Sequence, residues 1–285
     1  MPAYWKPIQY GDQESLAQAR EQMHQAIQIV AAIGRTYLPK VKDDHYANFK
    51  WNPERELLQG NVIEGDQNFS AALELKGLAI HLLNSSNQTV ASFSLHGKTQ
   101  KATLIWLEGE LVKLGVEGSR LTVQLPYEIP VYPTSKGKEF NFFHEDPFIA
   151  ISNYFSNTNL AVENVTSGVD GASEIRCWPH HFDIASLITL NDTGDAETST
   201  SIGVGMSPGD GGYNEPYYYL TPWPYPPVDK LPELDGPGNW HTDGWVGAVL
   251  TGSALINETG PEDQMEVVEN FFRQGVQSLK GLLSH

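Results

Sequence analysis

The sequence predicts an α+β fold in which antiparallel sheets are flanked by helices, in two similar-sized halves. Helical patterns occur near the start, the middle and the end of the chain, and the short β-prone runs between them are grouped rather than alternating with helices. Grouped strands favour antiparallel sheets over a doubly wound α/β fold. With 285 residues, the chain is long enough to bury a core without disulfides.

In the first half, apolar residues recur at three- and four-residue steps from Glu14 to Tyr37, and Pro39 follows. This pattern predicts an amphipathic helix. Five β-prone runs come next, broken by Asn, Gly and Ser as in an antiparallel meander. They are HYANFKW, RELLQGNVI, NFSAALELKG, LAIHLLN and TVASFSL. Leucines at similar steps over residues 104–114 then predict a second helix.

In the second half, residues 121–143 begin with a strand-like stretch and continue with a passage rich in Pro, Ser and Gly that suits a connection. A third helix is expected from near Pro147. Four β-type runs follow, EIRCWPHHFDIASLITL, STSIGVGMS, EPYYYLTPW and GWVGAVLTGS, and an apolar stripe over residues 265–283 predicts a last helix. We therefore expect halves over residues 1–130 and 131–285, either as two domains or as one continuous domain, with the candidate site in the second.

Composition limits the classes of partner. The 35 acidic and 18 basic side chains give a formal charge of −17, which disfavours nucleic acid and anionic membranes as partners. A single cysteine excludes an intramolecular disulfide, and the first residues lack a signal-peptide pattern, so we expect a cytoplasmic protein. The expected partner is a small polar molecule, and composition does not indicate an oligomeric state.

The segment RCWPHHFDIASL, residues 176–187, holds the only cysteine, two adjacent histidines and an aspartate. If the segment is one strand, alternation places His181 and Asp183 on the same face, together with Cys177. Imidazole and carboxylate together suit zinc, nickel, copper, iron, manganese or magnesium. The H-x-D spacing is a weak signal, however, and a hydrogen-bonded pair at a strand end is the simpler alternative.

Aromatic and acidic residues strengthen the hypothesis of a site. Residues 207–226 place Asp210 and Glu215 around a glycine turn before a run of tyrosines, and WHTDGW adds His241. Aromatic walls with a few fixed polar groups are typical of small-molecule pockets. The alternative is an ordinary Pro-Gly-Asp-Gly-Gly turn beside a tyrosine-rich sheet surface.

Two histidines of the first half are further candidates. His24 lies on the predicted helix beside its apolar stripe, where a buried, hydrogen-bonded histidine is the simpler interpretation. His45 follows an acidic pair at a strand start. The candidate catalytic residues are His181, Asp183, Asp210 and Glu215; the candidate ligand-binding residues are Trp178, Tyr217, Tyr219, Trp223, Trp240, His24 and His45; the candidate metal ligands are His181, Asp183 and His241.

Several motifs in combination resemble a bacterial protein family known only as a domain of unknown function. They are WPHHFDIA, GMSPGD, EPYYYLTPWPYP and WHTDGWVGA in the second half, and MHQAIQIVAAIGR, DDHYANFKW and TLIWLEGELVKLG in the first. The resemblance covers most of the chain and implies no activity. Because other members carry a different residue at the position of His180, it favours His181 and Asp183 as site residues.

Three functions stay open. One is an enzyme that acts on a small polar substrate by metal or acid–base chemistry, with His181 as ligand or base, Asp183 orienting it, and a divalent metal ion as the implied cofactor. The second is a non-catalytic protein that stacks aromatic side chains on a sugar or another flat ligand. The third is a structural or partner-binding protein whose aromatic, Pro-rich segment 213–227 covers another chain.

Overall fold

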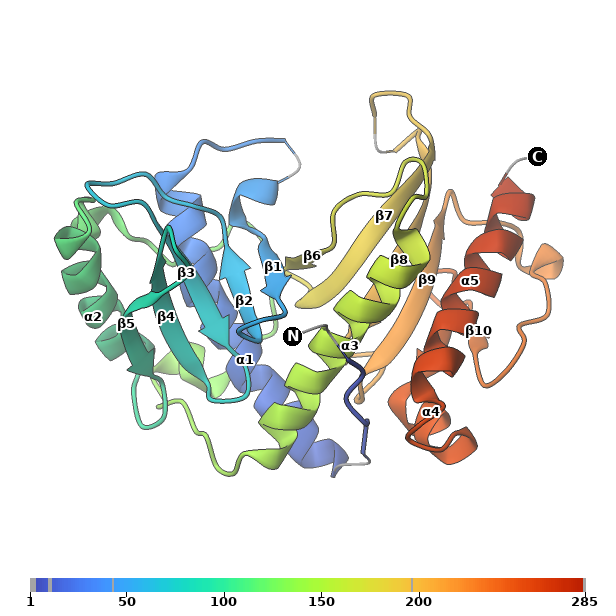
Figure 1. Cartoon of the computed structure of the whole chain (residues 1–285), viewed down its shortest axis with the longest axis horizontal. Helices are drawn as coiled ribbons and strands as arrows, with labels where there is room; N and C mark the ends of the chain where they lie inside the picture. Colours follow the sequence, from blue (N-terminus) through green and yellow to red (C-terminus); the bar gives the residue numbers. More distant parts are fainter. Residues whose placement is uncertain (1–3, 10–11, 43, 196, 284–285) are drawn as a thin grey trace. The chain divides into compact units, whose positions relative to one another are not determined.

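The computed structural model describes residues 4–9, 12–42, 44–195 and 197–283. Within these ranges it confirms the predicted α+β class: five α-helices pack on an antiparallel sheet of eleven strands (Figure 1). The strand order is β10-β11-β9-β8-β7-β6-β1-β2-β3-β4-β5. None of the described helices has the length and hydrophobicity needed to cross a membrane.

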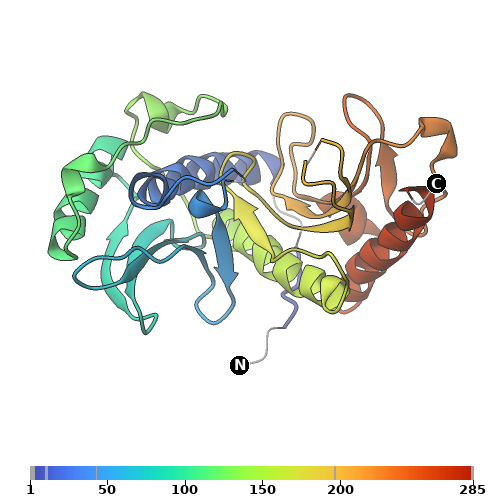
Figure 2. The same cartoon turned by 90° about the horizontal axis from the view of Figure 1, so that it is seen from above.

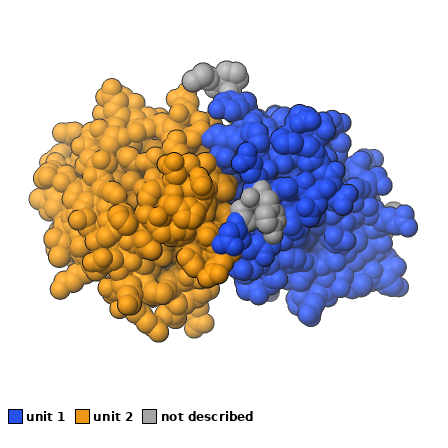
Figure 3. Space-filling view, turned by 90° about the horizontal axis from the view of Figure 1, so that it is seen from below, with its two compact units in different colours: residues 1–13, 153–176, 183–285 blue, residues 14–152, 177–182 orange. Residues whose placement is uncertain are grey.

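The chain divides into two compact units (Figure 3). Unit 1 contains residues 1–13, 153–176 and 183–285, and unit 2 contains residues 14–152 and 177–182. Residues 131–152, expected with the second half, therefore belong with the first. Helix α3 (Asp146–Thr166) begins in unit 2 and ends in unit 1.

Unit 2 follows its predicted elements closely. They are α1 (Gln13–Tyr37), the 3₁₀ turn η1 (His45–Ala47), β1 (Phe49–Asn52), β2 (Leu57–Gly60), β3 (Phe69–Glu74), β4 (Ala79–Asn84), β5 (Thr89–Ser94) and α2 (Gln100–Lys113). The strand-like stretch expected at the start of residues 121–143 is wrong. Pro126, Pro130 and Pro133 interrupt this region, and proline cannot donate a ladder hydrogen bond. After η2 (Gly118–Arg120), the region contains the short turn η3 (Pro133–Lys136) and isolated bridges at Glu139 and Phe140.

Unit 1 contains the remaining helices and strands. They are the later part of α3, β7 (Asp183–Asn191), β8 (Thr200–Ser207), β9 (Tyr217–Trp223), the 3₁₀ turn η4 (Val228–Lys230), β10 (Asn239–His241), β11 (Gly247–Thr251), α4 (Gly252–Glu258) and α5 (Gln264–Leu283). Two elements were not expected. Strand β10 has three residues, and α4 begins directly where β11 ends, with the Thr251 side chain accepting the Ala254 N–H, so neither gives a long periodic signal.

The strand predicted over residues 176–187 is wrong in its middle. Strand β6 (Arg176–Trp178) ends before a turn over residues 179–182, and β7 begins at Asp183. The Phe182 N–H donates to the Trp178 carbonyl at 2.7 Å, and Phe182 has a left-handed φ of 57°. His181 and Asp183 therefore do not alternate along one strand, and the argument that they share a face fails.

Helices α3 and α5 cover one face of the unit 1 strands. Figure 2 shows both helices on the same side of β7, β8 and β9. On that side Tyr218 is fully buried, with ring centroids 6.1 Å from Tyr154 of α3 and 5.9 Å from Phe272 of α5. Because side chains alternate along β9, Tyr217 and Tyr219 belong to the opposite face.

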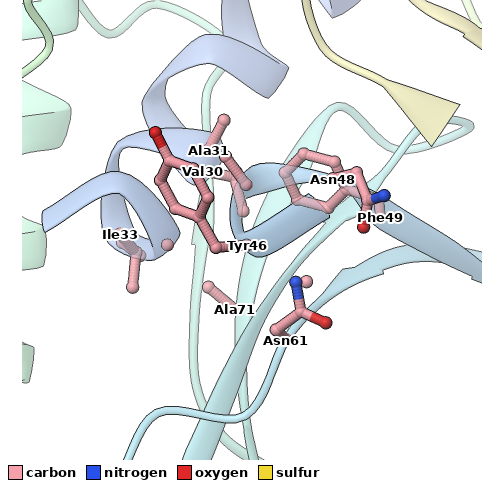
Figure 4. A pocket seen from close by; sticks show the side chains of 11 residues that line it. Val30, Ala31, Ile33, Tyr46, Asn48, Phe49, Asn61 and Ala71 are labelled. Atoms are coloured by element: carbon pink, nitrogen blue, oxygen red, sulfur yellow. The ribbon is translucent and has the colours of Figure 1, made fainter. Parts of the chain in front are cut away.

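Helix α1 packs closely on the η1 turn within unit 2. A cavity of about 10 Å³ lies in this contact, lined in part by Val30, Gly34, Tyr46 and Asn61 (Figure 4). Such a volume is about that of one water probe. At Gly34 an added Cβ would lie 2.5 Å from the Tyr46 carbonyl oxygen. Glycine is therefore required at this position by close approach of the backbone.

Replacing Gly34 by alanine is expected to lower the free energy of unfolding by about 1–3 kcal/mol, because α1 or η1 must shift to admit the methyl group. Gly109 is the matched control, since it also lies in a helix and a Cβ there meets nothing within 4 Å. Gly109→Ala is expected to stabilise by about 1 kcal/mol. Urea unfolding of both variants checks this, and equal stability of the two variants would contradict the packing argument.

Candidate functional site

The candidate site lies on the face of unit 1 opposite helices α3 and α5, which we call the tyrosine face. One row across its five strands consists of residues in register: Ala185, Gly205, Tyr219, Val249 and Asn239. Alternation adds Asp183 on β7, Tyr217 on β9 and His241 on β10 to the same face. The antiparallel register therefore gathers candidates that are far apart in the sequence.

Two tyrosine–aspartate hydrogen bonds organise this face. The Tyr219 hydroxyl donates to Asp183 Oδ2 at 2.5 Å, and the Tyr217 hydroxyl donates to Asp210 Oδ2 at 2.7 Å. Asp210 is held in turn by the glycine turn, because its Oδ1 accepts the N–H groups of Gly212 at 2.7 Å and Tyr213 at 3.0 Å. Hydrogen bonds from tyrosine hydroxyls thus orient both carboxylates.

An aromatic group extends from Tyr217 toward β10. The ring of Tyr213 lies 4.8 Å from the ring of Tyr217. The Tyr213 hydroxyl forms a hydrogen bond of 2.9 Å with His241 Nδ1. His241 stacks on Trp245 at 4.4 Å and its Nε2 lies 2.7 Å from the Asp243 carbonyl oxygen. A carbonyl oxygen only accepts, so Nε2 carries the proton and Nδ1 accepts from Tyr213. In this tautomer both nitrogens of His241 therefore have a hydrogen-bond partner.

The hydroxyls of Tyr217 and Tyr213 stay protonated near neutral pH. Burial raises the pKa of Tyr217 far above its ordinary value, and its hydrogen bond to Asp210 raises it further, while a bond to Ser207 acts in the opposite sense. The pKa of Tyr213 is raised by burial and by the nearby Asp210 charge. These hydroxyls therefore act as hydrogen-bond donors and not as bases or nucleophiles.

Glycines let neighbouring groups lie close to the sheet on this face. A Cβ at Gly247 would lie 2.3 Å from the Trp245 ring, and one at Gly203 would lie 2.5 Å from Thr221 Oγ1. A Cβ at Gly205 would lie 2.5 Å from a backbone atom, the Ile184 carbonyl oxygen. Trp245 can lie against β11 only because position 247 has no side chain.

Three other predicted residues of unit 1 have local structural contacts. Glu215 accepts from the Ser253 hydroxyl at 2.8 Å and the Ser253 N–H at 2.7 Å, at the start of α4. Trp223 is 38% exposed and donates from Nε1 to the Glu197 carbonyl at 3.0 Å. Trp240 donates to the Pro232 carbonyl at 2.7 Å. These contacts anchor loops, and the structure does not bring Glu215 into the Asp183–Asp210 network.

In unit 2, His24 is part of a buried polar group. Its Nε2 lies 3.0 Å from the Pro179 carbonyl oxygen, its Nδ1 lies 2.8 Å from the Tyr132 hydroxyl, and its ring stacks on Phe182 at 5.5 Å. Burial lowers its pKa to about 4; the hydrogen bond to Pro179 opposes this shift, and the charge of Arg20 adds to it. His24 is thus neutral at pH 7, in agreement with the simpler interpretation of a satisfied core histidine.

The adjacent histidines form a second aromatic group in unit 2. The ring of His180 lies 4.2 Å from that of His181, 5.4 Å from Tyr127 and 6.2 Å from Trp178. Burial lowers the pKa of His180 to about 4, the His181 charge lowers it further, and Asp44 opposes the shift. His181 and His45 are exposed.

No group of three His, Cys, Asp or Glu side chains among the described residues could hold a metal ion. The three candidate ligands also fall in different units, since His181 belongs to unit 2 whereas Asp183 and His241 belong to unit 1. Cys177 is fully buried. The metal hypothesis therefore gains no support from this geometry and stays a prediction.

Sequence analysis missed Tyr213, Ser207 and Trp245 as members of the tyrosine-face network. A signal was available for Tyr213, because it follows the glycine turn directly and precedes the acidic Glu215. Trp245 ends the WHTDGW motif that contains His241. Nothing in the local sequence distinguishes Ser207 from the other serines, and only the β8–β9 register places it opposite Tyr217.

Comparison with known proteins identifies no relative: no family model, curated protein or solved structure matches this chain. The resemblance to an uncharacterised bacterial family therefore stays a prediction, and the function is argued from geometry alone.

We expect the free energy of unfolding to fall as pH falls from about 6.5 to about 4, through His24. Its folded-state pKa of about 4 lies below its ordinary value of 6.5, so the unfolded chain binds this proton first. The contribution of neutral His24 to the free energy of unfolding is therefore fully present above pH 6.5, and it is lost as the pH decreases toward 4.

For His24 alone, the slope is about 1.4 kcal/mol per pH unit between the two pKa values. Urea unfolding at several pH values, compared between the wild type and His24→Gln, measures this contribution. A wild-type slope that His24→Gln leaves unchanged would contradict it.

Proposed function

We propose that the protein binds a small polar molecule on the tyrosine face of unit 1. The observation that carries this proposal is the pair of hydrogen bonds Tyr219–Asp183 and Tyr217–Asp210, which fixes two carboxylates and two phenol rings on one sheet face. Tyr219 is half-buried and Asp210 is exposed, so both a ring and a carboxylate remain accessible there. Such preorganised groups bind with little loss of side-chain entropy.

Binding is better supported than acid–base catalysis by the protonation states of this face. The pKa of Tyr217 is raised well beyond the neutral range, and both nitrogens of His241 are occupied by Tyr213 and Asp243. A general base needs a lone pair and a pKa near the working pH. The carboxylates instead offer acceptor sites, which suit the hydroxyl or ammonium hydrogens of a ligand.

Charge restricts the ligand further. Unit 1 carries 19 Asp and Glu residues against 5 Lys and Arg residues, a formal charge of −14 with histidine neutral. This field repels anions and favours neutral or cationic ligands. A flat polyhydroxyl ring, neutral or bearing an ammonium group, combines stacking on Tyr219 with hydrogen bonds to Asp183 or Asp210.

Three sugars of one ring size test this proposal: glucose, glucosamine as the cationic form, and glucuronate as the anionic form. We expect glucose or glucosamine to raise the melting temperature and glucuronate to have no effect, because a ligand stabilises a protein only by preferring its native state. Calorimetric titration in a reducing buffer, which keeps Cys177 as a thiol, gives the affinity.

Variants assign the binding to the tyrosine face. Tyr219→Phe removes the hydroxyl that orients Asp183, and we expect it to weaken binding at least about fivefold, as loss of a hydrogen bond to a charged group implies. Tyr225→Phe is the matched control, since Tyr225 is 45% exposed and packs on Trp223 at 5.2 Å outside the network. Equal affinity of the two variants, or no binding of any of the three sugars, would count against the proposal.

A further inference from the structure

Unit 2 contains an open hollow that is separate from the residues discussed so far. It has a volume of about 490 Å³ and lies between the segment after β5 and the segment before α3. Its lining residues are His96, Gly97, Thr99, Gly137, Lys138, Glu139, Phe140 and Asn141. Gly97 and Gly137 have positive φ of 69° and 88°, and a Cβ at either position would meet nothing within 4 Å. Their left-handed backbone, and not a lack of space, therefore favours glycine at both positions.

The two walls of the hollow are fixed to each other by backbone hydrogen bonds. The Gly97 N–H donates to the Phe140 carbonyl at 2.9 Å, and the Phe140 N–H donates to the Lys98 carbonyl at 2.8 Å. The Phe142 N–H donates to His96 Nδ1 at 3.1 Å. In neutral His96 the ring proton therefore sits on Nε2, which makes this nitrogen a donor.

The two segments that line this hollow are rich in lysine, in a chain that is otherwise acidic. Residues 96–101 and 136–141 contain four lysines and one carboxylate, a formal charge of +3, whereas the whole chain carries −17. Lys138 lines the hollow, and Lys98, Lys101 and Lys136 lie within two residues of the lining. All four side chains are exposed, and none has an ion-pair partner within the part of the chain that the structure describes.

Four unpaired cations close together repel one another, and an anion relieves that repulsion. Two lysines elsewhere in the chain pair with carboxylates, Lys76 with Glu56 at 2.9 Å and Lys113 with Glu110 at 2.7 Å. The lysines of the hollow do not. Lysine binds phosphate as a compact point charge, and neutral His96, which lines the hollow, adds its Nε2–H as a directional donor.

We propose that this hollow binds a phosphate group of a small molecule. A divalent oxyanion matches the local charge of +3, whereas the rest of the acidic chain repels it. The expected ligand is a free phosphate ester and not a lipid, because the −17 charge of the chain opposes approach to an anionic bilayer. This site is independent of the proposed sugar site on unit 1.

The test is a titration of the full chain with inorganic phosphate and with glycerol 3-phosphate at low ionic strength, and with chloride at matched ionic strength as the reference. Heat of binding gives the affinity, and amide chemical shifts of Gly97 and Gly137 locate it. We expect saturable binding of both phosphates that shifts these two amides, and weaker binding when salt is added.

Charge-removing variants with a matched control complete the test. Lys138→Gln is expected to weaken phosphate binding about threefold, and the double variant Lys98→Gln with Lys138→Gln about tenfold, in line with ion pairs near a surface. Lys113→Gln, at the far end of α2, should bind like the wild type. Because all these lysines are exposed, the variants should keep the wild-type melting temperature.

The proposal is overturned if phosphate causes no saturable shift of Gly97 and Gly137, or if the double variant binds as tightly as Lys113→Gln. Vesicles that contain phosphatidic acid form the last arm of the test. Binding to these vesicles without binding of glycerol 3-phosphate would show that the hollow takes a lipid headgroup, and would overturn the assignment to a small molecule.

Discussion

The two-residue alternation of β9, held in register by its neighbours, is the constraint on which the candidate site depends. Tyr218 and Leu220 point to the helices, where Tyr218 meets Tyr154 and Phe272. Tyr217 and Tyr219 must then point to the other face, where their hydroxyls meet Asp210 and Asp183. A one-residue slip of β9 would exchange these two sets. Packing against α3 and α5 therefore fixes the chemistry of the opposite face.

Sequence patterns predicted most of the fold because the signals were local and periodic. The stripe over residues 14–37 and the strand runs of unit 2 each contain their own evidence of type and length. The turn over residues 179–182 was missed because the residues on either side of it are β-prone, although Pro179 was a signal against one continuous strand. The bond from the Phe182 N–H to the Trp178 carbonyl and the positive φ of Phe182 form the turn. Strand β10 is too short to show a period.

The candidate site could be predicted only in part, because its contacts depend on strand register and not on spacing along the chain. Asp183, Asp210 and both tyrosines were identified by type, yet the pairing of Asp183 with Tyr219, 36 residues apart, is set by β7, β8 and β9 together. The prediction for His181 was wrong because it assumed that this residue lies on a strand. Strand β6 ends at Trp178, before His181. A residue type indicates possible chemistry, and the fold decides which groups meet.

Charge is distributed unequally between the two units, and this separates the ligand classes that each can bind. Unit 1 carries −14 and unit 2 only −3, because 13 of the 18 basic residues lie in unit 2. Added salt screens both fields. Salt therefore weakens the binding of a cation to unit 1 and the binding of a phosphate to the lysines near Lys138. The affinity for a neutral polyol changes little. A strong salt dependence thus separates a charged ligand from a neutral polyol, and the sign of the ligand's charge indicates which of the two surfaces binds it.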